Sequence, residues 1–451
     1  MTKLSANCAI FTVLPILIFL FVCSSSASDQ IPAAKQSHPI LLRGGAIHVV
    51  SGADIENGSI LFENGVITAV GTNLTVPDDT EIIDLAGKHV YPGLISTNTS
   101  LGLVEIGAVR STRDLAETGE YNPNVRAEVS FNPDSELLPV TRSNGIMLAL
   151  SVPLGGIISG TSALMMLDGW TWESMILKAP VGLHLRWPKM IVKQSPRAKK
   201  SVKERLKERN EKIAKIKETF ASARAYRKAK EVEAERGIPY HDTDLRWEAM
   251  ISVLKKEIPL FVHANEIQQI QAALDFVTEQ NIKAVLVGGY DAWRAADQLR
   301  KMNVPVIITG IHRLPMRRWA PYDEPFTLPA KLHAAGIQYC IATAGGGFQS
   351  AHERNLPYHA GTAAAYGLSK DEALKAITLY PAQILGIADR VGSLAAGKDA
   401  TLIITDGDPL EIMTHVNAAF IQGRKIDLSN RHTELYRKYK TKIERLHAEG
   451  K

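Results

Sequence analysis

The amino-acid sequence predicts an α/β fold, with a parallel sheet or barrel in the middle of the chain and a smaller sheet domain built from both ends. Continuous apolar runs alternate with helical patterns between residues 259 and 379, as in βα units whose strands are buried on both faces. Short alternating runs with turn signals fill residues 40–91, and a second strand-rich stretch covers residues 399–424. The length of 451 residues is sufficient for more than one folding unit.

The composition is that of an ordinary globular protein. Hydrophobic residues make up 45% and charged residues 22%, which excludes an intrinsically disordered chain. Three cysteines (Cys8, Cys23 and Cys340) cannot form a disulfide framework or the CxxC pairs of a structural zinc site, and we expect Cys340 to be a buried, unpaired thiol. The net charge of +5 is unevenly distributed. Residues 197–236 hold 15 Lys and Arg against 7 Glu, a net of +8, which leaves 5 − 8 = −3 for the remaining chain.

The N-terminus predicts a cleaved signal peptide over residues 1–27. Lys3 precedes an apolar run from Ala9 to Val22, and small residues surround a cleavage position after Ala27. The run is shorter than the roughly 20 residues that a membrane span needs, and no later segment is apolar enough to span. We therefore expect an exported protein, periplasmic or extracellular, with no membrane span; a lipid anchor at Cys23 is the alternative.

The two ends of the chain carry the strand signals of the smaller domain. A Pro- and Ser-containing leader at residues 28–39 precedes the first of them, and Glu63-Asn64-Gly65 predicts a hairpin turn of the Asn-Gly type. The expected strands are Ile40–Arg43, Ala46–Val50, Gly58–Phe62 and Val66–Val70 at one end, and Asp399–Thr405 and Ala418–Arg424 at the other.

The middle of the chain carries the βα signals. Strands are expected at Gly145–Val152, Val181–Leu185, Pro259–Val262, Lys283–Val287, Val304–Thr309 and Ile337–Thr343, and helices at Glu266–Gln280, Ala292–Lys301 and Lys370–Leu379.

The basic segment Lys199–Glu235 predicts a long helix, and two interpretations of it are open. It could bind nucleic acid or another anionic surface, or it could cover the barrel with Ile213, Ile216, Phe220 and Tyr226 facing inward. Aromatic residues are not interleaved with the basic ones, as stacking on bases requires. We favour the second interpretation and expect no nucleic-acid partner.

Three stretches carry a family resemblance. They are Ile82–Lys88 followed by Tyr91–Ile95, then Val262-His263-Ala264, then Val391–Ala400, and they occur in the expected order and separation. With them the chain resembles the amidohydrolase superfamily, in particular its imidazolonepropionase-like branch. The resemblance implies a distorted (β/α)8 TIM-like barrel that carries a β-sandwich in two parts. The expected boundaries are β-sandwich at 40–91 and 389–427, barrel at 92–388 with a charged helical insertion at about 197–237, and a C-terminal helix at 428–451.

The resemblance also implies a metal centre, which this sequence departs from. The family holds one or two divalent metals with His-x-His after strand 1, His after strands 5 and 6, and Asp after strand 8, and the metal activates a water. Here Asn98 and Ser100 stand in place of the first pair, Gly288 in place of the strand-6 histidine and Ala344 in place of the aspartate; His263 is retained. Because a catalytic zinc needs about three protein ligands, the standard mechanism is not expected.

Other polar residues at the same rim leave two possibilities open. His263 and His312 are the candidate catalytic residues, and with His352 or His359 they could form a rebuilt site for at most one zinc ion. Alternatively, the rim binds a small ligand without a metal. The candidate ligand-binding residues are Asn98, Ser100, Asn265, Glu266, Arg313 and His359.

The segment from Glu105 to Arg142 is dense in charges and amides, and we expect it over the barrel mouth. It could hold a polar substrate, or it could be a self-satisfied lid that packs on the barrel top or on a second subunit. The resemblance implies a hydrolase of non-peptide or small-peptide C–N bonds. The alternative is an inactive pseudoenzyme that binds a small amide-type ligand. Family members are often dimers, so a homodimer is possible.

Overall fold

The computed structural model describes residues 30–192, 194, 199–236 and 242–449, and the side chains of residues 233–236 are not described. The predicted signal peptide at residues 1–27, with Cys8 and Cys23, lies outside these residues. The described residues from Pro32 onward belong to one compact unit.

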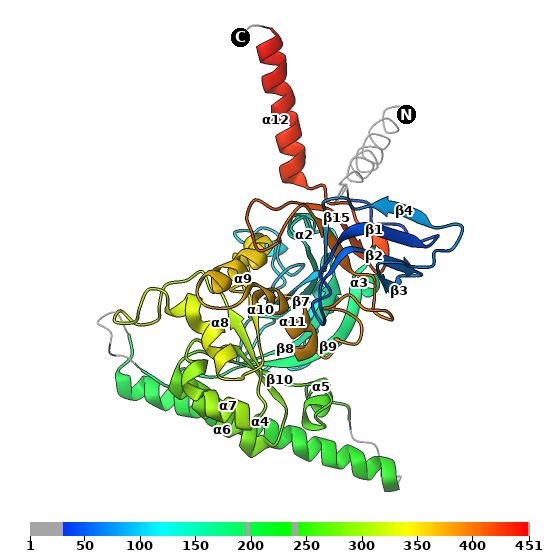
Figure 1. Cartoon of the computed structure of the whole chain (residues 1–451). Helices are drawn as coiled ribbons and strands as arrows, with labels where there is room; N and C mark the ends of the chain where they lie inside the picture. Colours follow the sequence, from blue (N-terminus) through cyan, green and yellow to red (C-terminus); the bar gives the residue numbers. More distant parts are fainter. Residues whose placement is uncertain (1–29, 193, 195–198, 237–241, 450–451) are drawn as a thin grey trace, which may run out of the picture. The chain divides into compact units, whose positions relative to one another are not determined.

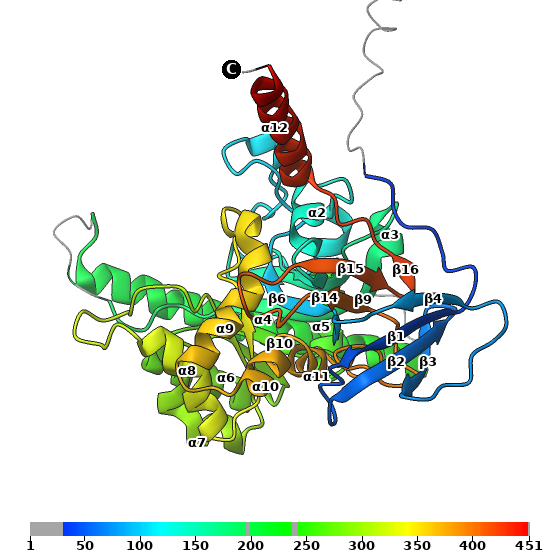
Figure 2. The same ribbon diagram turned by 45° about the horizontal axis from the view of Figure 1, so that its top comes forward.

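Both ends of the chain build one eight-stranded sheet, as the sequence predicts (Figure 2). Its order is β16-β15-β14-β5-β1-β2-β3, and β4 pairs with β1 beside β5. Phe62 of β2 meets Phe420 of β15 edge-on in the core of this sheet domain, with ring centroids 5.2 Å apart. The strands are β1 (Ile40–Ile47), β2 (Ile55–Glu63), β3 (Val66–Gly71), β4 (Glu81–Asp84), β5 (His89–Pro92), β14 (Leu402–Thr405), β15 (Val416–Ile421) and β16 (Arg424–Lys425).

Two sequence expectations for this sheet, its first strands and its Asn-Gly turn, can be compared with the structure. The strands expected at Ile40–Arg43 and Ala46–Val50 are a single irregular strand, β1, which continues through its two glycines. The hairpin turn has φ of 52° at Asn64 and 82° at Gly65, the left-handed pair that an Asn-Gly turn requires.

A second eight-stranded sheet forms the nearly closed barrel, in the order β13-β12-β11-β10-β9-β8-β7-β6. Its first and last strands lie side by side, and the Thr97 hydroxyl is 3.4 Å from the Cys340 sulfur between them. Cys340 is buried and free, as expected, and burial raises the pKa of its thiol to about 12. The strands are β6 (Leu94–Thr99), β7 (Ile146–Ser151), β8 (Ile158–Met166), β9 (Ile176–Arg186), β10 (Leu260–Ala264), β11 (Ala284–Gly288), β12 (Val306–Thr309) and β13 (Tyr339–Ala342).

The barrel departs from an all-parallel arrangement at β8, which is antiparallel to both β7 and β9. Only residues 152–157 connect β7 to β8, whereas a parallel crossover needs about a dozen residues or more. The sequence signal for this strand was missed because Gly160 and several hydroxyl residues interrupt its apolar run, although all of β8 is buried.

Helices surround the barrel (Figure 1). The helix expected at Lys370–Leu379 is broken in two, because Pro381 has no N–H to donate to the carbonyl of Ile377. The α-helices are α2 (Leu137–Arg142), α3 (Trp172–Met175), α4 (Val202–Arg236), α5 (Leu245–Leu254), α6 (Ile267–Gln280), α7 (Ala296–Lys301), α8 (Glu324–Ala334), α9 (Leu356–Ala365), α10 (Lys370–Lys375), α11 (Leu379–Ile384) and α12 (Arg431–Ala448); the 3-10 helices are η1 (Arg110–Thr112), η2 (Ala127–Ser130), η3 (Ala292–Ala295) and η4 (Gln349–Asn355).

The basic helix α4 lies on the outside of the barrel. Ile216, Phe220 and Ala223 are fully buried in the barrel core, and Ile213 and Tyr226 are half-buried. Basic side chains on the outer face form ion pairs with other elements, such as Lys217 with Glu279 of α6 at 2.6 Å. None of the helices among the described residues is both long and apolar enough to cross a membrane.

Candidate functional site

A polar cavity of about 210 Å³ lies where the C-terminal ends of the parallel barrel strands meet. This is the face at which barrels of this type place their functional residues. Every barrel strand except the antiparallel β8 contributes its end or the residues just beyond it. The lining residues are Asn98, Thr99, Ser100, Val152, Leu154, Arg186, His263, Asn265, Val287, Gly288, Tyr290, Thr309, Ala344, Gly345 and Gly346.

The end of β6 supplies two of the predicted ligand-binding residues. Asn98 and Ser100 are buried, and the Ser100 hydroxyl has no hydrogen-bond partner among the described residues. The Asn98 carboxamide packs against Gly345, whose φ is +66°, and a Cβ at that glycine would overlap the amide nitrogen. The loop after β13 therefore needs glycine there to leave room for Asn98.

Both ring nitrogens of His263, on β10, are occupied by neighbours from β9. Arg186 lies 3.4 Å from Nδ1 and His184 lies 3.0 Å from Nε2. Because a guanidinium can only donate, Nδ1 of His263 accepts a hydrogen bond and Nε2 carries the proton that is donated to Nδ1 of His184. Nε2 of His184 must then be protonated as well, and it is buried with no partner among the described residues.

Burial and charge keep this histidine pair neutral. Burial lowers the pKa of His263 well below its usual value, and the Arg186 charge and His184 lower it further. Burial also lowers the pKa of His184, again with a contribution from Arg186. The pKa of the Arg186 guanidinium is lowered by burial, and no carboxylate pairs with it in the described part of the chain. A second Arg186 nitrogen donates only weakly, to the Pro153 carbonyl at 3.5 Å.

At the family's ligand positions after β11 and β13, neither Gly288 nor Ala344 offers a side-chain donor atom. Gly288 has a φ of +98°, and a Cβ there would overlap Oδ1 of Asn265. That oxygen is buried without a partner among the described residues, so the Asn265 carboxamide fills the space that a side chain at position 288 would need. Ala344 packs beside Gly310, from the loop after β12, and presents only a methyl group.

Five of the predicted site residues do not line the cavity: His312, His352, His359, Arg313 and Glu266. His312 stacks on His359 at 4.1 Å and is 2.7 Å from the Thr362 hydroxyl; burial lowers the pKa of both rings, that of His359 to about 3. The guanidinium carbon of Arg313 lies 3.5 Å from the centre of the Tyr290 ring, and Tyr290 lines the cavity. Glu266 precedes α6 and one of its carboxylate oxygens is buried without a partner among the described residues.

The structure therefore does not assemble the rebuilt zinc site. In the described ranges, no three His, Cys, Asp or Glu residues lie close enough together to hold a metal ion. His312, in the loop after β12, and His359, on α9, stack on each other, and neither lines the cavity that His263 lines.

The segment from Glu105 to Arg142 packs on the residues after β7, where the Leu154 amide donates to the Leu115 carbonyl at 2.6 Å, and none of its residues lines the cavity. Leu103, Val104, Leu115 and Ala127 form a small cluster together with Leu154, which lines the cavity. Most of the charged side chains between residues 105 and 120 face solvent. This favours the interpretation as a packed lid over direct binding of a substrate by its arginines.

Two important residues were missed from the sequence. Arg186 directly follows the predicted strand Val181–Leu185 and precedes Trp187-Pro188, so its position at the rim is a usable signal. Glu353 lies ten residues beyond the last predicted barrel strand, Ile337–Thr343, where no periodic pattern assigns it a role. It is fully buried in η4 and accepts hydrogen bonds from the hydroxyls of Ser96 at 2.5 Å and Thr343 at 2.8 Å. Burial raises the pKa of the Glu353 carboxyl to about 6.

Comparison with known proteins identifies the family. A family model described as the amidohydrolase family matches residues 172–426, more than half of the chain. The chain belongs to the amidohydrolase family. An amidohydrolase from Thermotoga maritima MSB8 has a similar structure, with a TM-score of 0.75 and 26% identity over 86% of this chain and 99% of that chain.

Curated relatives of this amidohydrolase-family chain are more distant or match only in part. Amidohydrolase tasK of Hapsidospora irregularis is 21% identical over 418 residues, which cover 81% of this chain and 39% of that protein. Dihydropyrimidinase of Arabidopsis thaliana is 38% identical over 86 residues, 19% of this chain and 16% of that protein. The chain thus spans well under half the length of the curated relatives that it matches.

Proposed function

We propose that this amidohydrolase-family protein binds a small molecule carrying a carboxylate and an amide in its barrel mouth, without the metal-activated water of its family. The observation that carries the proposal is the contact of Arg186 with His263. This contact places a cation on the one retained ligand residue. Among the described residues, no acidic side chain lines the cavity that the cation faces.

The donor set argues against a metal at this position. A catalytic zinc takes about three protein ligands, and neutral amide or hydroxyl oxygens do not hold it without charged partners. At the five family positions the chain offers Asn98, Ser100, Gly288 and Ala344 besides His263. The lone pair on Nδ1 of His263 accepts from Arg186, and its Nε2 is protonated, so neither nitrogen is free to coordinate.

The same residues suit a small polar anion. Arg186 can form a forked pair with a carboxylate, which is stronger than a neutral hydrogen bond. Ser100 and Asn265 each present a buried oxygen with no partner among the described residues, and Asn98 adds a carboxamide. A volume of about 210 Å³ is below the usual range for drug-sized ligands, so the ligand would be small.

Calorimetric titration with two matched probes tests the proposal. N-acetylglycine carries a carboxylate and an amide, and N-acetylglycinamide replaces the carboxylate with a neutral amide. We expect the acid to bind at least about tenfold more tightly than its amide, because only the acid offers Arg186 a charge. Equal binding of both probes would contradict the role of Arg186. If neither binds, the mouth does not recognise this class of molecule.

A hydrolase of non-peptide or small-peptide C–N bonds is the second candidate. It is favoured by the likeness to the Thermotoga maritima amidohydrolase, which covers 99% of that chain. Release of acetate from N-acetylglycine, followed over time by NMR and abolished in His263→Ala, would support it over the pseudoenzyme. Export through residues 1–27 and membership of the imidazolonepropionase-like branch stay predictions.

A further inference from the structure

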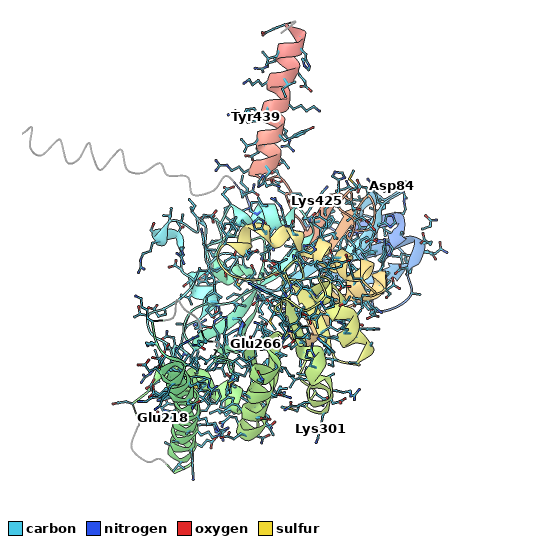
Figure 3. All side chains as sticks on the ribbon, turned by 90° about the vertical axis from the view of Figure 1, so that its left-hand side faces the viewer. Asp84, Glu218, Glu266, Lys301, Lys425 and Tyr439 are labelled. Carbon is cyan, nitrogen blue, oxygen red and sulfur yellow. The ribbon has the colours of Figure 1, made fainter. Side chains whose placement is uncertain are left out.

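The C-terminal helix α12 is fully formed, but it buries none of its side chains against the rest of the molecule. It begins at the buried Asn430, whose side chain caps the backbone N–H groups of His432 and Thr433. None of the residues from Arg431 to Ala448 is buried. Figure 3 shows Tyr439 on this helix, away from the other labelled side chains.

One face of α12 is apolar and exposed. Spacings of three and four residues place its members on the same side of a helix. Their exposed fractions run from 36% to 66%, although a surface helix normally buries such a stripe. An isolated helix of this length is marginal in water, so a partner for this face would stabilise it. The members are Leu435, Tyr436, Tyr439, Ile443 and Leu446.

The charges on α12 indicate what that partner is. Residues 431–448 hold six Lys and Arg against two Glu, a net of 6 − 2 = +4. At 100° per residue, Lys442, Lys438 and Arg431 border the apolar face on one side, whereas both glutamates, Glu434 and Glu444, point away from it. Basic residues that border an apolar stripe are typical of helices that lie in the interface of an anionic membrane.

We propose that α12 docks its apolar face on an anionic phospholipid surface, lying along the membrane rather than crossing it. Leu435, Ile443 and Leu446 would enter the boundary of the acyl chains, the two tyrosines would sit at headgroup level, and the bordering lysines would contact lipid phosphates. A second copy of the helix fits less well, because two surfaces of +4 repel each other.

Co-sedimentation of the full chain with vesicles tests this proposal. We expect binding to vesicles of phosphatidylglycerol mixed with phosphatidylcholine, weakened by salt, and little binding to phosphatidylcholine alone. Leu435→Ser with Ile443→Ser should lower the partition coefficient at least about tenfold. Lys442→Gln should lower it about fivefold, and the matched control Arg437→Gln, on the opposite side of the helix, should lower it less.

Because α12 buries none of its side chains, these variants should keep the thermal midpoint of the wild type, so a loss of binding is not a loss of fold. Absence of binding to the mixed vesicles, or binding that Leu435→Ser with Ile443→Ser leaves unchanged, would overturn the proposal. A dimer in light scattering that this double variant dissociates, together with no vesicle binding, would assign the face to a second copy instead.

Discussion

Arg186 brings a positive charge into the barrel mouth that the described part of the chain does not neutralise with a carboxylate. A bound anion would supply the missing charge. Arg186→Met keeps most of the side-chain length and removes the charge. We expect the Kd for N-acetylglycine to rise about tenfold to a hundredfold, since a charge-assisted pair contributes roughly 1.5–3 kcal/mol. The thermal midpoint without ligand should stay the same or rise, because an unpaired, half-buried charge is lost.

The control for this variant is Arg300→Met, which removes an exposed arginine that pairs with Asp297 at 2.8 Å. It should leave the Kd unchanged in the same calorimetric titration. A change in Kd for Arg186→Met that is no larger than that of the control would rule out Arg186 as the anion-binding group.

Glu353 makes the stability of the barrel depend on pH. Burial raises the pKa of its carboxyl from 4.5 to about 6, so the folded state binds more protons than the unfolded state between these values. The contribution of Glu353 to stability therefore falls as pH rises through this window, by about 2 kcal/mol in all. In Glu353→Gln, the unfolding free energy should lack this decrease with rising pH. Urea denaturation of both proteins from pH 4 to 7 checks it, and parallel curves for the two proteins would refute it.

We expect the histidine pair, His184 and His263, to make the unfolding free energy depend on pH in the opposite direction. Burial lowers the pKa of both His184 and His263, so the folded state resists protonation that the unfolded state accepts near pH 6.5. The stability that the pair contributes is present above pH 6.5 and is lost as pH falls below it. In His184→Phe with His263→Leu, the unfolding free energy should lose this acid sensitivity, measured by urea denaturation at pH 7 and pH 5.

At the end of β11, the structure leaves no room for the histidine that the family has at position 288. Gly288 is in a left-handed conformation, and the Asn265 carboxamide occupies the space beside it. We expect Gly288→Ala to lower the unfolding free energy by about 1–3 kcal/mol through strain and overlap. Adding Asn265→Ala should recover part of this loss, because it removes the overlap and leaves the strain. No recovery in thermal denaturation would show that overlap plays no part.

The sequence predicted most elements of the fold because their signals are local. The strand around His263, helix α6 and the Asn64-Gly65 turn depend on apolar periodicity and turn residues near each other in the chain. Strand β8 depends instead on a connection too short for a crossover, and its hydroxyl residues are buried only because neighbouring strands cover both faces. Such tertiary effects leave no periodic pattern in the sequence.

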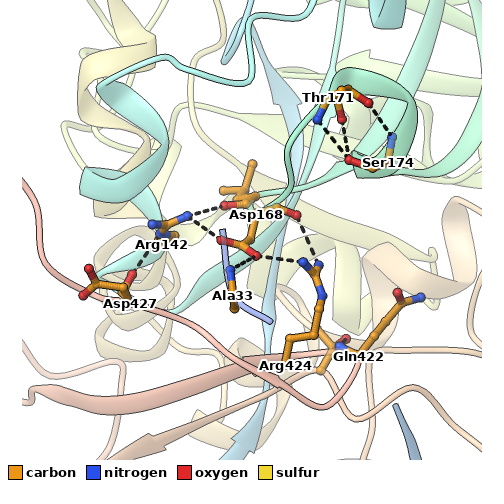
Figure 4. A network of polar contacts seen from close by, with 10 residues as sticks. Ala33, Arg142, Asp168, Thr171, Ser174, Gln422, Arg424 and Asp427 are labelled. Atoms are coloured by element: carbon orange, nitrogen blue, oxygen red, sulfur yellow. Dashed lines mark hydrogen bonds and ion pairs between the residues drawn. The ribbon is translucent and has the colours of Figure 1, made fainter. Parts of the chain in front are cut away.

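At the scale of the whole molecule, Asp168 joins the barrel, the sheet domain and the leader. Its buried carboxylate accepts from Arg142 of α2 at 3.1 Å, from Arg424 of β16 at 2.8 Å and from the backbone N–H of Ala33 at 3.1 Å (Figure 4). Asp168→Asn would leave two arginines in a buried place without their counter-charge. We expect the unfolding free energy to fall by about 3–5 kcal/mol.

The matched control for Asp168 is Asp84→Asn, which removes an exposed carboxylate 3.5 Å from Arg43. Exposed pairs contribute about 0–1 kcal/mol, so this variant should be nearly neutral in urea denaturation. Equal losses in the two variants would mean that the Asp168 network does not hold the parts of the molecule together.

The candidate site was predicted in part. Asn98, Ser100, His263 and Asn265 line the cavity, because strand ends in a barrel must converge and the strands were placed correctly. His312 and His359 meet each other instead, since loop conformation decided their positions and no periodic pattern predicts loops. The Arg186 contact with His263 joins residues 77 positions apart and needed the structure.

The metal content of the purified protein decides whether His263 still binds a metal ion. The full chain would be purified after growth in medium replete with zinc, manganese and iron, and its metal content measured by mass spectrometry. The occupied nitrogens of His263 predict less than about 0.2 equivalents of any transition metal. One equivalent or more that is retained through dialysis and lost in His263→Ala would contradict the account.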